Sequence, residues 1–224
     1  MRRYLAPLLI GLGGAAVLIW LGVWQVHRLE WKTAILAEID SRISAAPVDL
    51  PPVPDPEADR YLPVRVAGRT GARELHVLVS TRARGAGFRI IVPFQTDGGR
   101  RILLDRGFVP IDEKEAPRPP TRLEVTGNLY WPDERDRFTP DDDRAANYWF
   151  ARDVDVMADV FGTEPVLVIA RGTTGDDTSV SPLPLDTSGI PNDHLGYAVT
   201  WFGLAAVWLG MTGLQLWRIS RRTL

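Results

Sequence analysis

Two long stretches without charge constrain this chain more than any other feature of its sequence. Residues 4–26 and 195–217 contain no Asp, Glu, Lys or Arg, and they lie near the two ends of a chain of 224 residues. A helix of that length extends about 35 Å at roughly 1.5 Å per residue, which is enough to cross the hydrocarbon core of a bilayer. We therefore expect two transmembrane helices. A cleavable signal peptide is the alternative for the first stretch, but its apolar run is longer than that of a signal peptide.

The charges around these stretches predict how the chain crosses the membrane. Five arginines lie at the outer ends of the chain: Arg2, Arg3, Arg218, Arg221 and Arg222. Of the 26 basic residues, 21 therefore remain with all 28 acidic residues in the middle, which carries a formal charge of −7. The positive-inside rule then places residues 1–3 and 218–224 in the cytoplasm and residues 27–194 outside it. An acidic outer domain also argues against nucleic-acid binding.

The middle of the chain predicts a mainly antiparallel β domain, so the expected fold class is a membrane protein of the α+β type. Six segments alternate between apolar and polar residues or are rich in β-branched ones: 61–69, 74–80, 87–95, 101–110, 122–132 and 165–171. The Asp97-Gly98 pair predicts a hairpin between the third and fourth of these. Their number suits a small sandwich or a small barrel, and the sequence does not decide between the two.

Other local signals predict one or two short helices and two irregular segments. Residues 153–162 suit a helix, with Asp153 as its N-cap and Gly162 just past its end. Apolar residues keep a helical spacing up to residue 43, so we expect the first helix to continue beyond the membrane. Residues 47–59 are rich in proline and predict an extended linker. Residues 172–193 predict a loop with an edge strand at 178–183.

The two apolar stretches have distinct faces when they are projected as helices at about 100° per residue. One face of the second stretch carries His194, Tyr197, Trp201 and Trp208, and another carries the small residues Gly203, Ala206, Gly210 and Gly213. The first stretch and the residues just after it carry Trp20, Trp24, His27 and Trp31 on one face and Gly11, Ala15 and Gly22 on another. We expect the small faces to pack on each other or on a partner. The aromatic faces are then free for a ligand, or form an interfacial belt that needs none.

His194 follows Pro191-Asn192-Asp193, which looks like a helix start. A helix N-terminus disfavours imidazolium, although the neighbouring Asp193 opposes that effect. A neutral imidazole can bind a metal ion through one ring nitrogen. A purely structural histidine with a satisfied hydrogen bond is the alternative.

Seven segments, in order along the whole chain, resemble the surfeit locus protein 1 family of cytochrome oxidase assembly factors. They read LGVWQVHRLEWK, YLPVRVAG, GFRIIVPF, LLDRGFVP, VTGNLYWP, NYWFARDV and NDHLGYAVTWFGLA. Phe108 stands where many relatives have tryptophan, and Asp193 stands where a second asparagine is common. The bacterial members of this family imply a protein of the inner membrane with a periplasmic domain.

The resemblance implies that the protein binds haem a as cargo and assists its insertion into subunit I of haem-copper cytochrome c oxidase. The implied partners are subunit I, the haem a synthesis machinery and membrane lipid. The family histidine falls on His194, the expected ligand to the haem iron. The expected cofactor-binding residues are His194, Tyr197, Trp201, Trp24 and Arg28, with Gln25 and Lys32 also aligned and His27 as a candidate second ligand. A haem-independent scaffold that stabilises subunit I is the alternative function.

Little in the sequence indicates an enzyme. Cysteine is absent, which excludes disulfides and thiolate chemistry. His76 lies in a predicted strand and is expected to be half-buried. The run Asp141 to Asp143 is expected to be a solvated acidic loop rather than a cation site. Arg106 is expected to pair with an acid or to bridge a hairpin.

Overall fold

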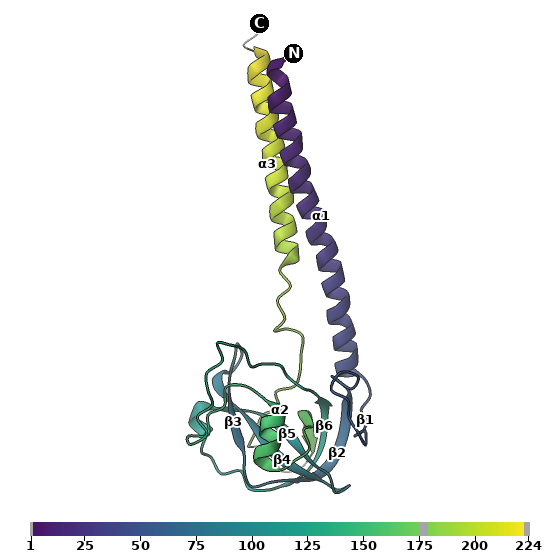
Figure 1. The fold of residues 1–224 in the computed structure, drawn as a ribbon, viewed down its shortest axis with the longest axis vertical. Coiled ribbons are helices and arrows are strands. Elements are labelled where there is room, and N and C mark those ends of the chain that lie inside the picture. The colour runs from purple at the N-terminus through teal and green to yellow at the C-terminus, as the bar shows by residue number, and fades with distance from the viewer. Residues whose placement is uncertain (1, 175–178, 222–224) are drawn as a thin grey trace. The chain divides into compact units, whose positions relative to one another are not determined.

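The computed structural model of the chain describes residues 2–174 and 179–221. The chain divides into two compact units (Figure 1). A helical unit contains the residues up to Glu38 and those from Thr187 onward, and a β unit contains Ile39–Asp186. This division confirms an α+β fold class.

Two long helices stand at the ends of the chain: α1 (Arg2–Ser44) and α3 (His194–Arg221). Within the described residues, both are long and apolar enough to cross a membrane. The prediction that the first helix continues past its apolar stretch is confirmed, because α1 ends only at Ser44. Its last turn belongs to the β unit, where the Ile43 carbonyl accepts hydrogen bonds from Asn128 and Arg171.

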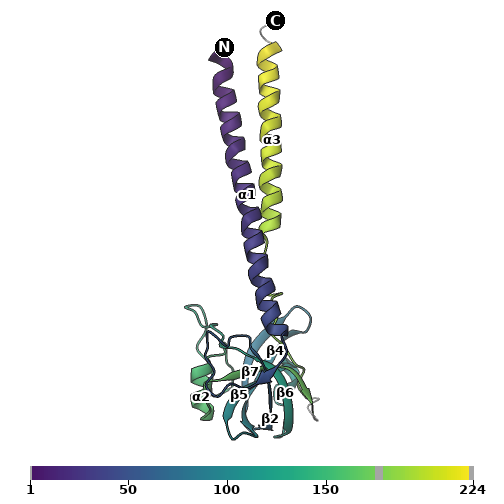
Figure 2. The ribbon, with the colours of Figure 1, turned by 90° about the vertical axis from the view of Figure 1, so that its right-hand side faces the viewer.

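In the helical unit, α1 and α3 lie side by side and antiparallel (Figures 1 and 2). The Trp208 indole N–H donates to the Gly11 carbonyl over 3.0 Å. Nearer the start of α3, Gly22 lies against the ring of Phe202. Residue numbers rise along one helix as they fall along the other, so the register of these contacts is antiparallel.

The small face predicted on α1 does make the helix contact, but the small face predicted on α3 does not. Gly203, Gly210 and Gly213 have open space where a side chain would start. On α3 the buried small residues are Ala198 and Ala205 instead. The large side chains of α3 lie over the glycines of α1, so only one helix needs glycines for close approach. Trp208 is therefore part of the helix contact and not of a free aromatic face.

The β unit is a closed barrel with two added strands. Its strands are β1 (Val48–Asp49), β2 (Pro63–Thr70), β3 (Leu75–Thr81), β4 (Gly85–Thr96), β5 (Arg101–Pro110), β6 (Arg122–Leu129) and β7 (Leu167–Thr174). They follow the order β1-β2-β6-β7-β5-β4-β3, and an extra pairing of β2 with β4 closes a ring of five. Most pairings are antiparallel as predicted, but β1–β2 and β5–β7 are parallel, so the sheet is mixed.

The local predictions inside this unit are mostly confirmed. The turn after Thr96 joins β4 and β5 as a hairpin. Helix α2 (Val154–Phe161) is capped by the Asp153 side chain, which accepts from the Val156 N–H, and Gly162 ends it with φ 63°. Strand β7 runs three residues further than predicted, to Thr174. The predicted edge strand at 178–183 is reduced to one bridge between Ser181 and Phe108, and its first residue lies outside the described residues. A 3-10 turn (Ile111–Glu113) follows β5, and β1 falls in the proline-rich linker.

Both faces of the central strands are buried. On β5, Ile102 and Leu104 point into the barrel core, whereas Leu103 points outward. The outward cluster is covered by Met157 and Phe161 of α2. Successive side chains of a strand alternate between faces, so a fully apolar strand is the pattern expected when both faces are covered.

Candidate functional site

His194 is the first residue of α3, and its side chain meets α1. Its ring Nδ1 lies 2.8 Å from Oε1 of Gln25, which is only 9% exposed. A carboxamide oxygen accepts but does not donate, so this bond assigns the hydrogen to Nδ1. In the neutral ring the lone pair is then on Nε2, the arrangement of many metal-binding histidines.

Sequence reasoning aligned Gln25 with the family but missed its contact with His194. A signal for that contact was present. One face of α1 carries Gly11, Ala15, Gly22 and Gln25 at helical spacing. The first three are small residues. A polar residue continuing a helix-packing face needs a polar partner, and His194 is the polar residue that faces it.

The predicted aromatic residues lie on one flank of this pair. By helical rotation, Trp24 and Arg28 are turned roughly 100° and 60° from Gln25 in one direction. Tyr197 and Trp201 are turned roughly 60° and 20° from His194 in the same direction. In antiparallel helices that face each other, equal rotations lead to the same flank.

The helix contacts agree with this assignment. Gly22 and Phe202 are rotated in the opposite direction, and they touch each other on the other flank. Trp24 and Tyr197 are about half exposed, at 49% and 57%. The Arg28 guanidinium lies 4.0 Å from the centre of the Trp31 ring. The first flank therefore combines exposed aromatic faces, a cation and the imidazole.

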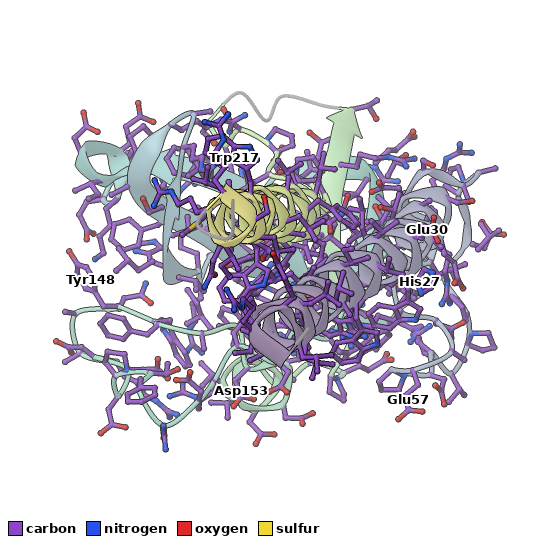
Figure 3. All side chains as sticks on the ribbon, turned by 90° about the horizontal axis from the view of Figure 1, so that it is seen from above. His27, Glu30, Glu57, Tyr148, Asp153 and Trp217 are labelled. Carbon is purple, nitrogen blue, oxygen red and sulfur yellow. The ribbon has the colours of Figure 1, made fainter. Side chains whose placement is uncertain are left out.

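His27 does not join this group. It is rotated roughly 160° from Gln25 and lies along the side of α1 away from α3 (Figure 3). Among the described residues there is no cluster of three or more His, Asp or Glu side chains suited to a metal ion. His194 is therefore the imidazole that the helical unit offers on this flank.

The other histidine that the sequence singled out lies in the barrel. His76 is 4% exposed, so the expectation of a half-buried side chain is wrong. Its Nε2 lies 2.7 Å from Oε1 of Glu74. The Glu74 carboxylate also accepts hydrogen bonds from Nε and Nη2 of Arg118. Leu75, His76 and Val77 are all buried, and the segment at Trp149 pairs with the edge of β3 at Val77.

Other charged residues of the barrel are engaged within it. Arg89 donates to the buried Asp105 over 2.6 Å. Arg106 is 3% exposed and donates to Ser179. In the acidic loop, Asp142 accepts from Arg135 over 2.7 Å and Asp143 accepts from the backbone of the following turn. These contacts are ion pairs and hydrogen bonds within the β unit.

Fold and site together define a class of protein: a β-barrel unit inserted between two helices that are long and apolar enough to cross a membrane, with a histidine–glutamine pair between the helices. The sequence model of the SURF1 family matches residues 12–206. The chain therefore belongs to the SURF1 family, as its motifs predicted.

Several vertebrate proteins named surfeit locus protein 1 are similar to this chain. That of Mus musculus is 31% identical over 212 residues, which cover 80% of this chain and 66% of the relative. That of Xenopus tropicalis is 34% identical over 213 residues, with the same two shares. That of Homo sapiens is 33% identical over 215 residues, with shares of 80% and 67%. The chain spans just under two thirds of the mouse and frog relatives.

Proposed function

We propose that this protein assists the assembly of haem-copper cytochrome c oxidase by binding haem a and helping to insert it into subunit I. His194 Nε2 is the proposed ligand to the haem iron. The observation that carries this proposal is the bond between His194 Nδ1 and Gln25, because it holds the ring in one orientation and, in the neutral ring, leaves the lone pair on Nε2.

The surroundings of His194 support a flat apolar ligand with acidic groups. Aromatic surface is offered by Trp24, Tyr197 and Trp201. They lie on the flank where the haem ring would bind if Nε2 is the ligand to the iron. Arg28, or Lys32 one turn further along, would pair with haem propionates through charge-assisted hydrogen bonds. A single protein ligand also suits a carrier, which has to release its cargo. In this proposal the protein acts as a carrier and not as an enzyme.

We further propose a location in a bacterial inner membrane, and the two apolar helices and the charge distribution support a membrane location. Both termini are then cytoplasmic and the barrel is periplasmic. The partners are subunit I and the machinery that makes haem a.

One observation favours a second function, that of a haem-independent scaffold for subunit I. The bond between His194 and Gln25 is itself a contact between helices, so the histidine also has a structural use. The two functions differ in whether the purified protein carries haem through His194.

The deciding experiment is pyridine haemochrome analysis of protein purified in detergent from cells that make haem a. We expect the wild type and His27→Ala to carry haem a and His194→Ala to lose it, with the loss partly reversed by added imidazole. Gln25→Leu should weaken haem binding by about 10- to 100-fold, the usual effect of removing the partner of a metal-binding histidine. The matched substitution Gln215→Leu, at the other end of the helix pair, should not. Equal haem contents in the wild type and His194→Ala would favour the scaffold.

A further inference from the structure

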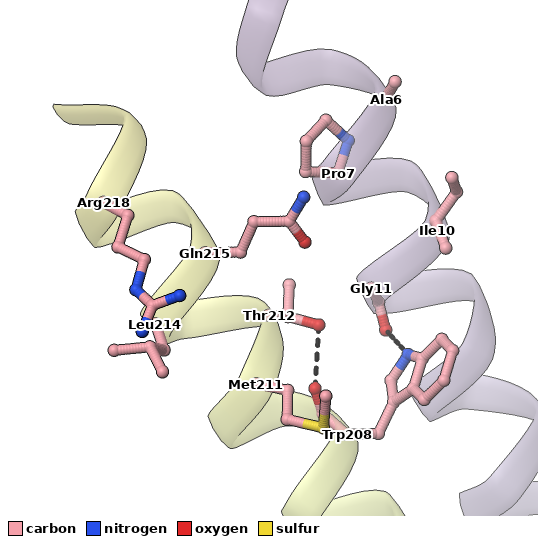
Figure 4. A pocket seen from close by; sticks show the side chains of 10 residues that line it. All are labelled: Ala6, Pro7, Ile10, Gly11, Trp208, Met211, Thr212, Leu214, Gln215 and Arg218. Atoms are coloured by element: carbon pink, nitrogen blue, oxygen red, sulfur yellow. Dashed lines mark hydrogen bonds between the residues drawn. The ribbon is translucent and has the colours of Figure 1, made fainter. Parts of the chain in front are cut away.

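An apolar groove runs along one side of the helix pair. Its volume is about 580 Å³, and seven residues line it: Gly14, Val17, Leu18, Leu204, Val207, Trp208 and Met211. The Trp208 N–H is already bonded to the Gly11 carbonyl, as the dashed line in Figure 4 shows. The groove wall therefore consists of hydrocarbon, one thioether and an indole whose donor is occupied. We call it the flank groove.

The flank groove lies on the same flank as Trp24, Arg28 and Tyr197. Val17 is rotated roughly 80° from Gln25 in their direction, and Leu204 is rotated roughly 80° from His194 in that direction as well. Leu204 is about 15 Å along α3 from His194, and Met211 is about 25 Å away, at roughly 1.5 Å per residue. On α3 the groove thus starts about 15 Å from His194, a distance similar to the width of a haem ring, and it continues along the helices.

We propose that the flank groove holds the isoprenoid tail of haem a while His194 holds the iron. This proposal rests on the proposed function and names the part of the ligand that the protein selects. Haem a joins a rigid ring to a flexible apolar chain at the ring edge. With the iron held by His194 and the ring over the aromatic flank, the chain would enter the groove at the end nearer His194.

The lining of the groove suits such a chain. Gly14 lets the Trp208 indole lie close against α1 as one wall of the groove, and Met211 adapts its shape to a slender branched ligand. Lipid tails are as apolar as the groove, so binding here gains little from leaving lipid. The gain comes from close packing in a shaped channel, and it distinguishes a haem with an attached tail from one without. A lipid acyl chain or a partner helix would fill the same groove without any link to His194.

The test compares haem o, which has the tail, with haem b, which lacks it, on the full chain in detergent. We expect the wild type to bind haem o about tenfold more tightly than haem b. Val207→Trp fills the groove and should lower the affinity for haem o to that for haem b, while the affinity for haem b and its absorbance spectrum stay unchanged. Val199→Trp is the matched control, because Val199 and Val207 are similarly exposed, at 65% and 60%, and are rotated to opposite flanks. It should preserve the preference.

The outcomes separate this proposal from the one on which it rests. Binding of both haems through His194 with equal affinity would leave the carrier function standing and overturn the tail site, as would a preference that survives Val207→Trp. Binding of neither haem would overturn both. Melting temperatures of the two tryptophan variants, together with Leu204→Trp as a second groove-filling change, exclude an effect of misfolding.

Discussion

At the scale of single residues, Glu74 shows how the barrel uses buried charge. Burial raises the pKa of this carboxyl, but the hydrogen bonds from His76 and Arg118 outweigh that effect and lower the pKa to about 2. The Arg118 side chain is 1% exposed, so its charge depends on Glu74 for a partner. A carboxyl with a lowered pKa in the folded protein stabilises the fold above its unfolded pKa, and that stabilisation is lost as the pH falls toward the folded pKa.

We expect the stability contributed by Glu74 to be complete above about pH 5 and to disappear toward pH 2. Glu74→Gln should therefore lower the free energy of unfolding at pH 7 by about 3 kcal/mol and flatten the pH dependence in that window. Urea unfolding of the full chain in detergent, repeated from pH 7 to pH 2.5, measures both. Glu115→Gln is the control, because Glu115 is paired with Lys114 but its side chain is 82% exposed, and it should change little. Equal effects of the two variants would contradict the role assigned to burial.

The sequence was informative about which residues have distinctive chemistry and less so about their partners. Helical rotation grouped His194 with Tyr197 and Trp201, but also with Trp208, which belongs to the helix contact, and the family resemblance singled out His194 as the expected ligand. Gln25 continues the small face of α1 that makes the helix contact. Its partner was missed because the contact face of α3 was predicted at Gly203, Gly210 and Gly213, which have open space. The burial of His76 was missed because the segment that pairs with its strand comes more than 70 residues later in the chain.

At the scale of elements, the helix pair depends on glycines of α1 facing large side chains of α3. A Cβ added at Gly14 would lie 2.5 Å from Nε1 of Trp208, whereas one added at the adjacent Gly13 would meet nothing within 4 Å. Alanine at either position changes the helix propensity in the same way, but only alanine at Gly14 disturbs the packing. A comparison of the two substitutions therefore isolates the contribution of packing.

Gly14→Ala should displace the Trp208 ring and weaken its bond to Gly11, lowering stability by about 1–3 kcal/mol. Gly13→Ala should be neutral or raise stability by up to about 1 kcal/mol, because alanine favours a helix more than glycine does. Thermal unfolding of the two full-length variants in the same detergent compares them directly. The prediction fails if Gly14→Ala melts at or above the temperature of Gly13→Ala.

Elements with local signals were predictable, and long-range pairings were not. The hairpin turn and both caps of α2 depend on a few adjacent residues. Closure of the barrel depends on the pairing of β2 with β4. Where these strands pair, a Cβ on Gly68 would lie 2.1 Å from the Gln95 carbonyl oxygen, so the close approach requires glycine. Alternation within a strand does not show which edges meet, so the choice between sandwich and barrel stayed open.

At the scale of the whole molecule, the antiparallel helix pair brings the first and last helical residues to the same end of the helical unit. That arrangement agrees with the arginine clusters that flank the two apolar stretches, which the positive-inside rule assigns to one side of the membrane.

The absence of cysteine allows this orientation to be tested with single-cysteine variants. Asp141 in the barrel and Ser220 near the end of α3 are both exposed. In right-side-out vesicles, an impermeant maleimide should label Asp141→Cys at once and Ser220→Cys only after permeabilisation. Reversed labelling would refute the proposed orientation, and immediate labelling of both would refute two membrane crossings.

The pairing of the two end helices also has a consequence for how the protein is made. Gln25 and His194 are 169 positions apart in the chain. At about 5–20 residues per second, a ribosome needs roughly ten to thirty seconds to add that length. For that interval the glycine face of α1 is already synthesised while its partner helix does not exist. The length of the barrel thus sets a delay in biogenesis, and whatever covers the glycine face in the meantime must leave before the histidine meets the glutamine.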